Sequence, residues 1–240
     1  MKEPASDFWV VCLAGSAGGL QSYIDILQNL PSDTGMAFVV APHRSLQQPE
    51  LLPEILARST TMAVTQVETG TRLERDHVFV MPPGTRMTLD GNMFCLRKAP
   101  PPTGWPETIN VFLYSLAEVK GPWAVAVILS GLDSDGSAAL ASIKAAGGVT
   151  FAQADPIVED MPRSAVETGN VDFLLPSEEI ARRCQGWREN LSNGSSNIPI
   201  DYVRGGSVTP GLSSVVDQTT DAWPDPPVTN QLQVLNTWGF

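Results

Sequence analysis

Side chains that could together carry out nucleophilic catalysis follow three separate apolar runs of this sequence. Ser16 stands in AGSAGGL, His43 in VVAPHRS, and Asp133 and Asp135 in ILSGLDSDG. A serine hydroxyl is a weak nucleophile at neutral pH and needs an adjacent base, which a carboxylate can hold in the correct orientation. The residue types therefore match a nucleophile, its base and the group that orients the base.

These side chains can meet only if the runs before them are neighbouring strands of one sheet. In an open α/β sheet, ligands bind outside the carboxyl ends of the strands. The expected strands at 8–14, 36–41 and 123–129 each end just before one of the candidates. The sequence therefore places the serine, the histidine and the carboxylates at one edge of the predicted sheet.

The glycine-rich segment around Ser16 also has simpler interpretations. Its glycines could cradle a phosphate, yet GxGxxG is absent because residue 17 is alanine, and no GK[ST] follows. A GxSxG nucleophile elbow is absent as well, since residue 14 is alanine. Ser16 could instead simply begin a helix, with the glycines allowing close packing.

The histidine and the two aspartates each have a structural alternative. His43 is one of two histidines, and a lone histidine is often structural; His77 precedes an expected strand and should lie at the opposite edge of the sheet. Asp135 could cap the helix expected to begin at residue 137, and Asp133 could be a loop carboxylate. The DxDG fragment lacks the remaining ligands of a calcium loop. We rank Asp135 above Asp133 for the third role, although position alone does not separate them.

Apolar runs alternate along the chain with segments in which apolar residues recur at helical spacing. Such alternation is typical of a parallel sheet covered on both faces. We therefore predict an α/β fold with a doubly wound, mainly parallel sheet, helices on both faces and a small β-hairpin. The expected strands are 8–14, 36–41, 63–67, 78–81, 123–129, 149–152 and 171–175, and the hairpin is 87–96 with Asp90-Gly91 at its turn. The expected helices are 20–30, 51–56, 109–119, 137–146 and 177–187.

The composition changes after about residue 190. The segment 190–240 contains one basic residue, Arg204, and many Ser, Gly, Thr, Asn and Pro residues, a composition typical of disorder. We predict a single folded domain over 1–189 and a flexible, disordered tail or linker over 190–240.

Composition and charge exclude several classes of function. The 240 residues include 15 Lys and Arg against 26 Asp and Glu, a net charge of −11, so we expect no nucleic-acid partner. Three widely spaced cysteines without a CxxC argue against a disulfide framework and against a zinc site. The apolar stretch near the N-terminus is too short to span a bilayer. We expect a cytoplasmic protein without membrane insertion, a metal or a cofactor.

Several motifs in their order resemble the catalytic domain of chemotaxis protein-glutamate methylesterases, the CheB family. They are AGSAGGL, the histidine after the second strand, ILSGLDSDG, AAGGVTFAQ and DMPRSAVETGNVDFLLP, and the similarity covers about residues 7–188. Three segments, TGMAFVV, LLPEILARST and MPRSAVETG, are especially similar to methylesterase domains that are fused to a chemotaxis methyltransferase.

The resemblance implies a Ser–His–Asp hydrolase in a methylesterase-like catalytic domain over 1–189. By position, Ser16 matches the nucleophile of the family, His43 its base and Asp135 its triad acid. The implied substrate is a glutamate γ-methyl ester on the cytoplasmic helices of a chemoreceptor, or on another methylated signalling protein. Family members often also deamidate receptor glutamines. Because the chain starts a few residues before its first expected strand, we expect no receiver domain of the kind that shields the site in other members.

The sequence departs from the family pattern near the expected site. Ala17 replaces the usual Thr after the nucleophile, Leu132 replaces the Met of the TGMGxDG stretch, and Asn110 replaces the usual Asp at a helix start. Backbone N–H groups near Ala17 and Gly18 could stabilise the oxyanion, and an N–H of the Leu132 loop is a second candidate.

Other residues near the expected site could be structural or could contact substrate. Met161, Pro162 and Arg163 are expected on a loop beside the site, and the same two roles are open for Arg44 and Gln153. Three other functions stay open from the sequence alone. They are a catalytically silent module that binds receptors or signalling partners, a nucleotide-binding domain, and an esterase or deamidase acting on other proteins.

Overall fold

The computed structural model of the chain describes residues 8–43, 51–99 and 107–192, with side chains up to residue 187. Two of the sequence-based predictions, the tail beyond residue 192 and a role for Arg44, fall outside these described residues.

Seven strands form one parallel sheet in the order β3-β4-β2-β1-β7-β8-β9. The three central strands, β1, β2 and β7, are completely buried, as apolar strands covered on both faces must be. The chain runs outward from β1 through β2, returns to the other side of β1 at β7, and continues outward to β9, so the predicted doubly wound α/β fold is confirmed. The strands are β1 (Val10–Gly15), β2 (Ala37–Pro42), β3 (Ala63–Gln66), β4 (His77–Val80), β7 (Ala124–Ile128), β8 (Val149–Gln153) and β9 (Phe173–Leu175).

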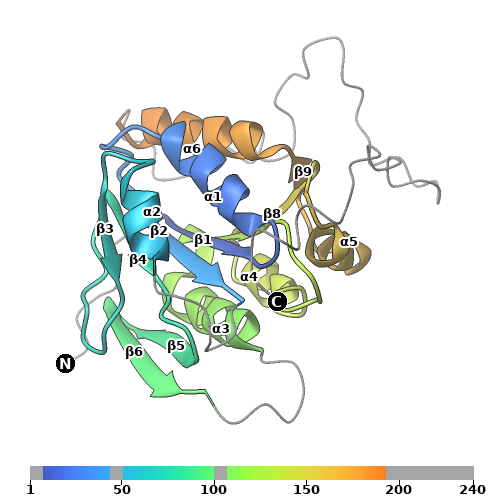
Figure 1. Cartoon of the computed structure of the whole chain (residues 1–240), viewed down its shortest axis with the longest axis horizontal. Coiled ribbons are helices and arrows are strands. Elements are labelled where there is room, and N and C mark those ends of the chain that lie inside the picture. Colours follow the sequence, from blue (N-terminus) through green and yellow to red (C-terminus); the bar gives the residue numbers. More distant parts are fainter. Residues whose placement is uncertain (1–7, 44–50, 100–106, 193–240) are drawn as a thin grey trace. The chain divides into compact units, whose positions relative to one another are not determined.

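Helices cover both faces of this sheet (Figure 1). One face carries α1, α2 and α6, of which α1 contacts both others, and the opposite face shares its core with α3, α4 and α5. The pleat of β1 separates the two cores, because Val10, Cys12 and Ala14 pack with α3, α4 and α5 while the alternate residues face the other way. The helices are α1 (Gly19–Gln28), α2 (Leu52–Ala57), α3 (Thr108–Lys120), the 3₁₀ turn η1 (Gly121–Trp123), α4 (Leu140–Ala145), α5 (Asp160–Glu167) and α6 (Ser177–Ser192).

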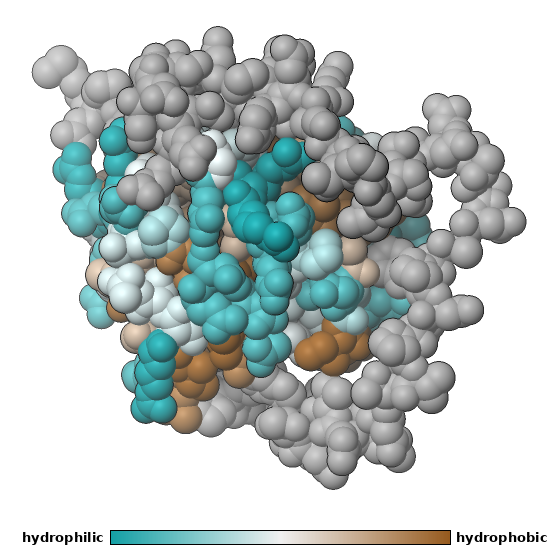
Figure 2. All heavy atoms as spheres, turned by 90° about the horizontal axis from the view of Figure 1, so that it is seen from above, coloured by the Kyte–Doolittle hydropathy of each residue, from teal (hydrophilic) through white to brown (hydrophobic). Residues whose placement is uncertain are grey.

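The surface on the side of α1 and α6 is mainly hydrophilic, with separate apolar patches (Figure 2). On α6, Arg182 and Glu179 form an exposed ion pair at 2.9 Å. This surface is what amphipathic helices present when their apolar faces pack on a sheet. None of the helices in the described parts of the chain is long and apolar enough to cross a membrane.

A separate hairpin of β5 (Thr85–Asp90) and β6 (Met93–Lys98) packs against α3. Asp90 pairs with Met93, so the two turn residues are Gly91 and Asn92, one position later than predicted. Gly91 has a φ of +58°, a left-handed conformation that glycine adopts readily in such turns. The predicted hairpin is therefore confirmed, with its turn shifted by one residue.

Two helices differ in extent from the predictions. The helix expected from residue 137 begins only at Leu140, because the preceding residues form turns with i to i+3 hydrogen bonds. In these turns the N–H of Ser137 donates to Ser134 O, and the N–H of Leu140 donates to Ser137 O. The last helix, α6, continues to Ser192, five residues beyond its predicted end and past residue 189.

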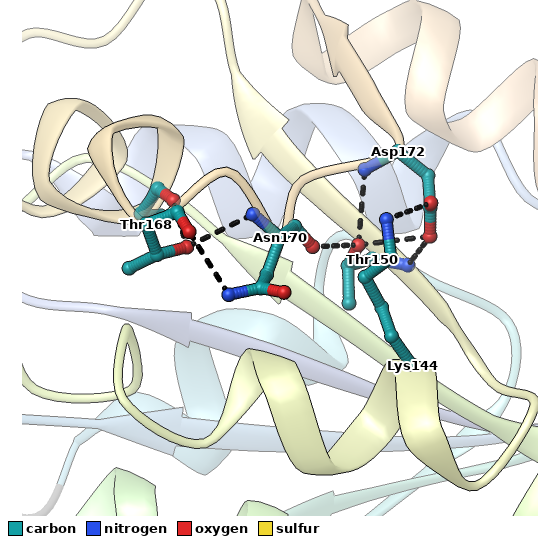
Figure 3. Close-up of polar contacts among 6 residues, drawn as sticks. Lys144, Thr150, Thr168, Asn170 and Asp172 are labelled. Carbon is teal, nitrogen blue, oxygen red and sulfur yellow. Dashed lines mark hydrogen bonds and ion pairs between the residues drawn. The ribbon is translucent and has the colours of Figure 1, made fainter.

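Hydrogen bonds at the amino end of β8 join three segments of the fold (Figure 3). The Thr150 hydroxyl donates to the carbonyl of Asn170 at 2.6 Å, and the Thr150 N–H donates to Asp172 Oδ2 at 3.0 Å. Lys144 Nζ of α4 lies 2.7 Å from Asp172 Oδ1. This network holds the edge of the sheet that lies opposite the candidate site.

Candidate active site

The candidate side chains lie at the carboxyl ends of β1, β2 and β7, where the chain connections from β1 diverge to the two sides of the sheet. Ser16 follows β1, His43 follows β2, and Asp133 and Asp135 lie between β7 and α4. Ligands of doubly wound folds bind at such a switch point. His77 begins β4 at the opposite edge, as predicted, with its Nε2 2.8 Å from Thr65 Oγ1.

Ser16 stands in a tight turn between β1 and α1. Its N–H donates to the carbonyl of Ser130 at 2.9 Å, and its own carbonyl accepts the N–H of Gly19 at 3.0 Å. The half-buried side chain donates from Oγ to the main-chain oxygen of His43 at 3.3 Å. The structure therefore brings the serine directly against the histidine residue, at the point where β1 and β2 end.

The backbone of His43 is fixed by the sheet itself. The His43 N–H donates to Gly15 O at 2.8 Å, which continues the pairing of β2 with β1 by one residue. Nε2 of the imidazole lies 3.4 Å from Oδ2 of Asp133. His43 is thus placed between the serine turn and the loop that carries the carboxylates.

Asp133 adopts a φ of +80°, a left-handed conformation that is uncommon for a residue other than glycine. Its Oδ1 accepts the N–H of Asp135 at 2.5 Å, the local hydrogen bond by which an aspartate forms a turn with the residue two positions later. Its Oδ2 is buried and faces His43. The local turn therefore holds the Asp133 carboxylate toward the imidazole.

Asp135 is buried and faces the start of α3. Its Oδ2 accepts the N–H of Ile109 at 2.9 Å, and its Oδ1 accepts the N–H of Asn110 at 3.0 Å. Burial raises the pKa of the Asp135 carboxyl, against the effect of these two N–H groups and of His43, while Asp133 raises it further. Asp135 thus satisfies the N-terminus of α3 and does not cap α4, the structural alternative considered from the sequence.

Asn110, at the start of α3, makes a second hydrogen bond to the segment between β7 and α4. Its side-chain Oδ1 accepts the N–H of Ala139 at 3.1 Å, directly before α4. The α3 start is therefore bound to the carboxylate loop at Asp135 and again at Ala139. Since an amide oxygen accepts this bond as well as a carboxylate would, the departure at Asn110 keeps the acceptor.

Two further residues support the serine turn, namely Ser130, which the sequence analysis did not single out, and Gln153, for which it left a structural role and a substrate contact open. Ser130, directly after the apolar run of β7, contacts the turn through its main chain and its hydroxyl. Gln153 at the end of β8 accepts hydrogen bonds at Oε1 from Ser22 Oγ and from the Ser130 N–H, both at 2.9 Å. Gln153 therefore supports the serine turn through its hydrogen bond to Ser130, which in turn accepts the N–H of Ser16.

The candidate oxyanion donors lie in the same turn. The N–H groups of Ser16 and Gly19 donate to main-chain carbonyls, so the N–H groups between them, of Ala17 and Gly18, are the candidates at the start of α1. Gly18 has a φ of +76°, and an added Cβ would lie 2.6 Å from Ser130 Oγ. The Leu132 side chain is 41% exposed on the neighbouring loop.

Met161, Pro162 and Arg163 lie in the first turn of α5, so their predicted loop conformation is wrong. Proline is tolerated in a first helical turn because its missing N–H has no partner there, and Asp160 favours the same end. Met161 is fully buried, and its Sδ lies where a side chain on Gly131 would have to be. Met161 thus packs behind the Gly131 loop next to Ser16.

Arg163 is engaged on its own helix. Its guanidinium pairs with Glu159 and Asp160, both at 2.8 Å. Within the described segments, no group of three or more His, Cys, Asp or Glu side chains is placed to hold a metal ion.

A seven-stranded parallel sheet with a serine, a histidine and two carboxylates at its switch point defines an α/β protein with the components of a serine hydrolase. The family model described as CheB methylesterase matches residues 11–184. The chain belongs to the CheB methylesterase family.

Known relatives agree with this assignment. The chain is 32% identical over 191 residues to "Protein-glutamate methylesterase/protein-glutamine glutaminase 3" of Geobacter sulfurreducens, covering 75% of this chain and 52% of that protein. It is 43% identical over 132 residues, or 54% of this chain, to an uncharacterized 104.1 kDa protein of Rhodobacter capsulatus, of which the match covers 14%.

A solved structure shows the same fold. The CheB methylesterase catalytic domain of Thermotoga maritima matches with a TM-score of 0.69 at 25% sequence identity, covering 75% of this chain and 98% of that domain. The chain spans about half the length of the curated Geobacter relative. The part of the chain that matches the Thermotoga structure is therefore similar to a catalytic domain.

Proposed function

We propose that this chain is a serine hydrolase that removes methyl esters from glutamate side chains of chemoreceptors and releases methanol. One observation carries the proposal, namely the meeting of Ser16, His43 and two aspartates at one sheet edge in a chain of the CheB methylesterase family. The curated name of the Geobacter relative supports this reaction. Cytoplasmic location and binding to receptor helices, or to another methylated signalling protein, are parts of the same proposal.

In the proposed reaction, Ser16 Oγ attacks the ester carbonyl while the imidazole of His43 accepts the hydroxyl proton. The C–O bond to the methoxy group then breaks, and the imidazolium returns the proton so that methanol leaves. Water attacks the resulting acyl-enzyme with His43 again as base, which restores Ser16 and releases the glutamate. The N–H groups of Ala17 and Gly18, with that of Leu132 as a further donor, stabilise the oxyanion.

Asp135 is the proposed triad acid, and its role is to stabilise the imidazolium that forms on His43. Its support is electrostatic, because the charge of His43 lowers the pKa of the Asp135 carboxyl against the effect of burial. Asp133 is the carboxylate in direct contact with the ring. The two aspartates together place negative charge around the proton acceptor of the proposed reaction.

Deamidation of receptor glutamines fits the same residues. An amide carbonyl is attacked in the same way, and ammonia takes the place of methanol as the leaving group. The name of the Geobacter relative includes this second activity. We include it in the proposed function of this chain.

Labelling with a fluorophosphonate probe tests the proposed nucleophile. Wild type should be labelled, whereas Ser16→Ala and His43→Ala should not, although both variants keep the wild-type circular dichroism spectrum. Methanol release from a methylated receptor fragment should show the same dependence. Labelling that persists in Ser16→Ala, or a folded wild type that is not labelled, would overturn the proposal and favour a silent binding module.

A further inference from the structure

Ser130 makes four hydrogen bonds with its three polar atoms. Its N–H donates to Gln153 Oε1, and its carbonyl accepts the N–H of Ser16, both at 2.9 Å. Its hydroxyl donates to the carbonyl of Ala17 and accepts the N–H of Val158, again at 2.9 Å each. The residue is completely buried. Ser130 therefore links the end of β8, the serine turn and the segment before α5.

The turn that carries Ser16 has a defined type. The Gly19 N–H closes it on Ser16 O, and Gly18 at its third position has φ +76° and ψ −10°. These angles are those of a type II turn. A type I turn would need rotations of about 150° in ψ of Ala17 and about 170° in φ of Gly18, which together turn over the peptide between them.

The orientation of this peptide decides where one candidate oxyanion donor points. In a trans peptide the N–H points away from the C=O, so the Gly18 N–H is opposite in direction to the Ala17 carbonyl. The Ser130 hydroxyl holds that carbonyl toward the buried end of β7. The Gly18 N–H consequently points away from the Ser130 hydroxyl that holds the Ala17 carbonyl.

We propose that Ser130 is a positioning residue, whose hydroxyl holds the Ala17–Gly18 peptide so that the Gly18 N–H can stabilise the oxyanion. This inference rests on the proposed function. The hydroxyl acts through the Ala17 carbonyl and does not touch the substrate. Gly18 is required in the same arrangement, because its left-handed φ and the 2.6 Å left for a Cβ beside Ser130 Oγ both disfavour any side chain.

Four variants of the full 240-residue chain test this inference. Ser130→Ala removes the hydroxyl, Ser130→Thr keeps it, and Ser16→Ala removes the nucleophile. Thr150→Val is the matched control, because it also removes a buried hydroxyl with several hydrogen bonds, but at the opposite end of neighbouring β8. The measurements are kcat and KM for p-nitrophenyl acetate, the Ki of phenylboronic acid and the thermal midpoint of unfolding.

Ser130→Ala should lower kcat by about 10- to 100-fold with little change in KM, somewhat less than the loss of a whole oxyanion donor. Phenylboronic acid forms a tetrahedral adduct on a reactive serine, so its Ki should rise in proportion to the loss in kcat. Ser130→Thr should restore kcat to within about threefold of wild type if the hydroxyl is the active group. Thr150→Val should lower the thermal midpoint while kcat stays unchanged.

A Ser130→Ala variant with a lowered thermal midpoint but wild-type kcat and Ki would overturn the inference and leave a structural role. A kcat loss that Ser130→Thr does not reverse would also overturn it. If Ser130→Ala does not fold, the folded Ser130→Thr variant still decides, because a loss of more than about tenfold in its kcat contradicts a role for the hydroxyl. A wild type whose hydrolysis equals that of Ser16→Ala overturns the proposed function and this inference with it.

Discussion

The imidazole Nε2 of His43 lies 3.4 Å from Oδ2 of Asp133, and both side chains are about nine-tenths buried. The other oxygen of the same carboxylate accepts the N–H of Asp135. Asp135 itself binds the start of α3 through both of its oxygens. Two carboxylates only two residues apart therefore have different partners, and substitutions at the two positions should separate their effects.

Asp135→Asn should lower kcat for ester hydrolysis by up to about 10⁴-fold, because the imidazolium on His43 loses its buried counter-charge. Asp133→Asn should cause the smaller loss. Asparagine tolerates the left-handed φ of residue 133, so this variant changes the charge without a new backbone strain. Steady-state kinetics of both variants with p-nitrophenyl acetate, well below their thermal midpoints, make the comparison. A larger loss in Asp133→Asn would identify Asp133 as the triad acid instead of Asp135.

The raised pKa of Asp135 predicts how stability changes with pH. A carboxyl whose pKa is higher in the folded than in the unfolded state binds more protons when folded. Its contribution to stability is fully present below the unfolded pKa and is lost as pH rises through the folded pKa. The difference in free energy of unfolding between wild type and Asp135→Asn should therefore shift against the wild type as pH rises above about 4.

Urea titrations between pH 4 and 7 measure this difference. The titratable groups that face Asp135 are Asp133 of its own loop, His43 at the end of β2 and Cys12 of β1. Repeating the series with His43→Asn in both proteins removes the titration of the imidazole. A difference that is constant, or that moves in favour of the wild type, would contradict a raised pKa at Asp135.

Asn110→Ala should lower the free energy of unfolding by about 1–2 kcal/mol, because the buried N–H of Ala139 loses its acceptor. Asn170→Ala is a suitable control, since the hydrogen bond that its side chain donates to Thr168 O is exposed and local. That control should change stability by less than about 0.5 kcal/mol. Equal effects of the two substitutions in urea unfolding would show that the contact between α3 and the carboxylate loop is not stabilising.

The sequence predicted the sheet and the edge at which the candidate residues meet because both depend on local pattern. A run such as that of β7 signals a buried strand, and a parallel sheet then brings the ends of its strands together. The partners of Asp135 could not be predicted in this way, because Ile109 and Asn110 are 26 and 25 residues away and belong to another helix. An aspartate before a helix has the same local pattern whether it caps that helix or a different one.

Three further differences follow, of which only the first depends on a non-local contact. Ser130 follows an apolar run as many loop serines do, and only the folded chain places its hydroxyl beside the Ala17 carbonyl. The first turn of α5 was predicted as a loop because it follows a strand end, although Pro162 fits a first helical turn. The start of α4 was predicted too early, because i to i+3 turns replace the first predicted turn of this helix.

The buried thiols give a prediction that separates serine from cysteine chemistry. Burial raises the pKa of Cys184 to about 12 and raises that of Cys12 further, with Asp135 adding to the effect at Cys12. Because the thiolate is the reactive form, iodoacetamide at pH 8 should modify neither residue in the folded protein and both in urea. Ester hydrolysis should survive this treatment, as expected for a serine nucleophile. Peptide mass spectrometry after timed alkylation checks the sites, with wild-type activity measured in parallel. Inactivation that keeps pace with modification of Cys12, which lies in β1 four residues before Ser16, would instead point to a thiol that takes part in the reaction.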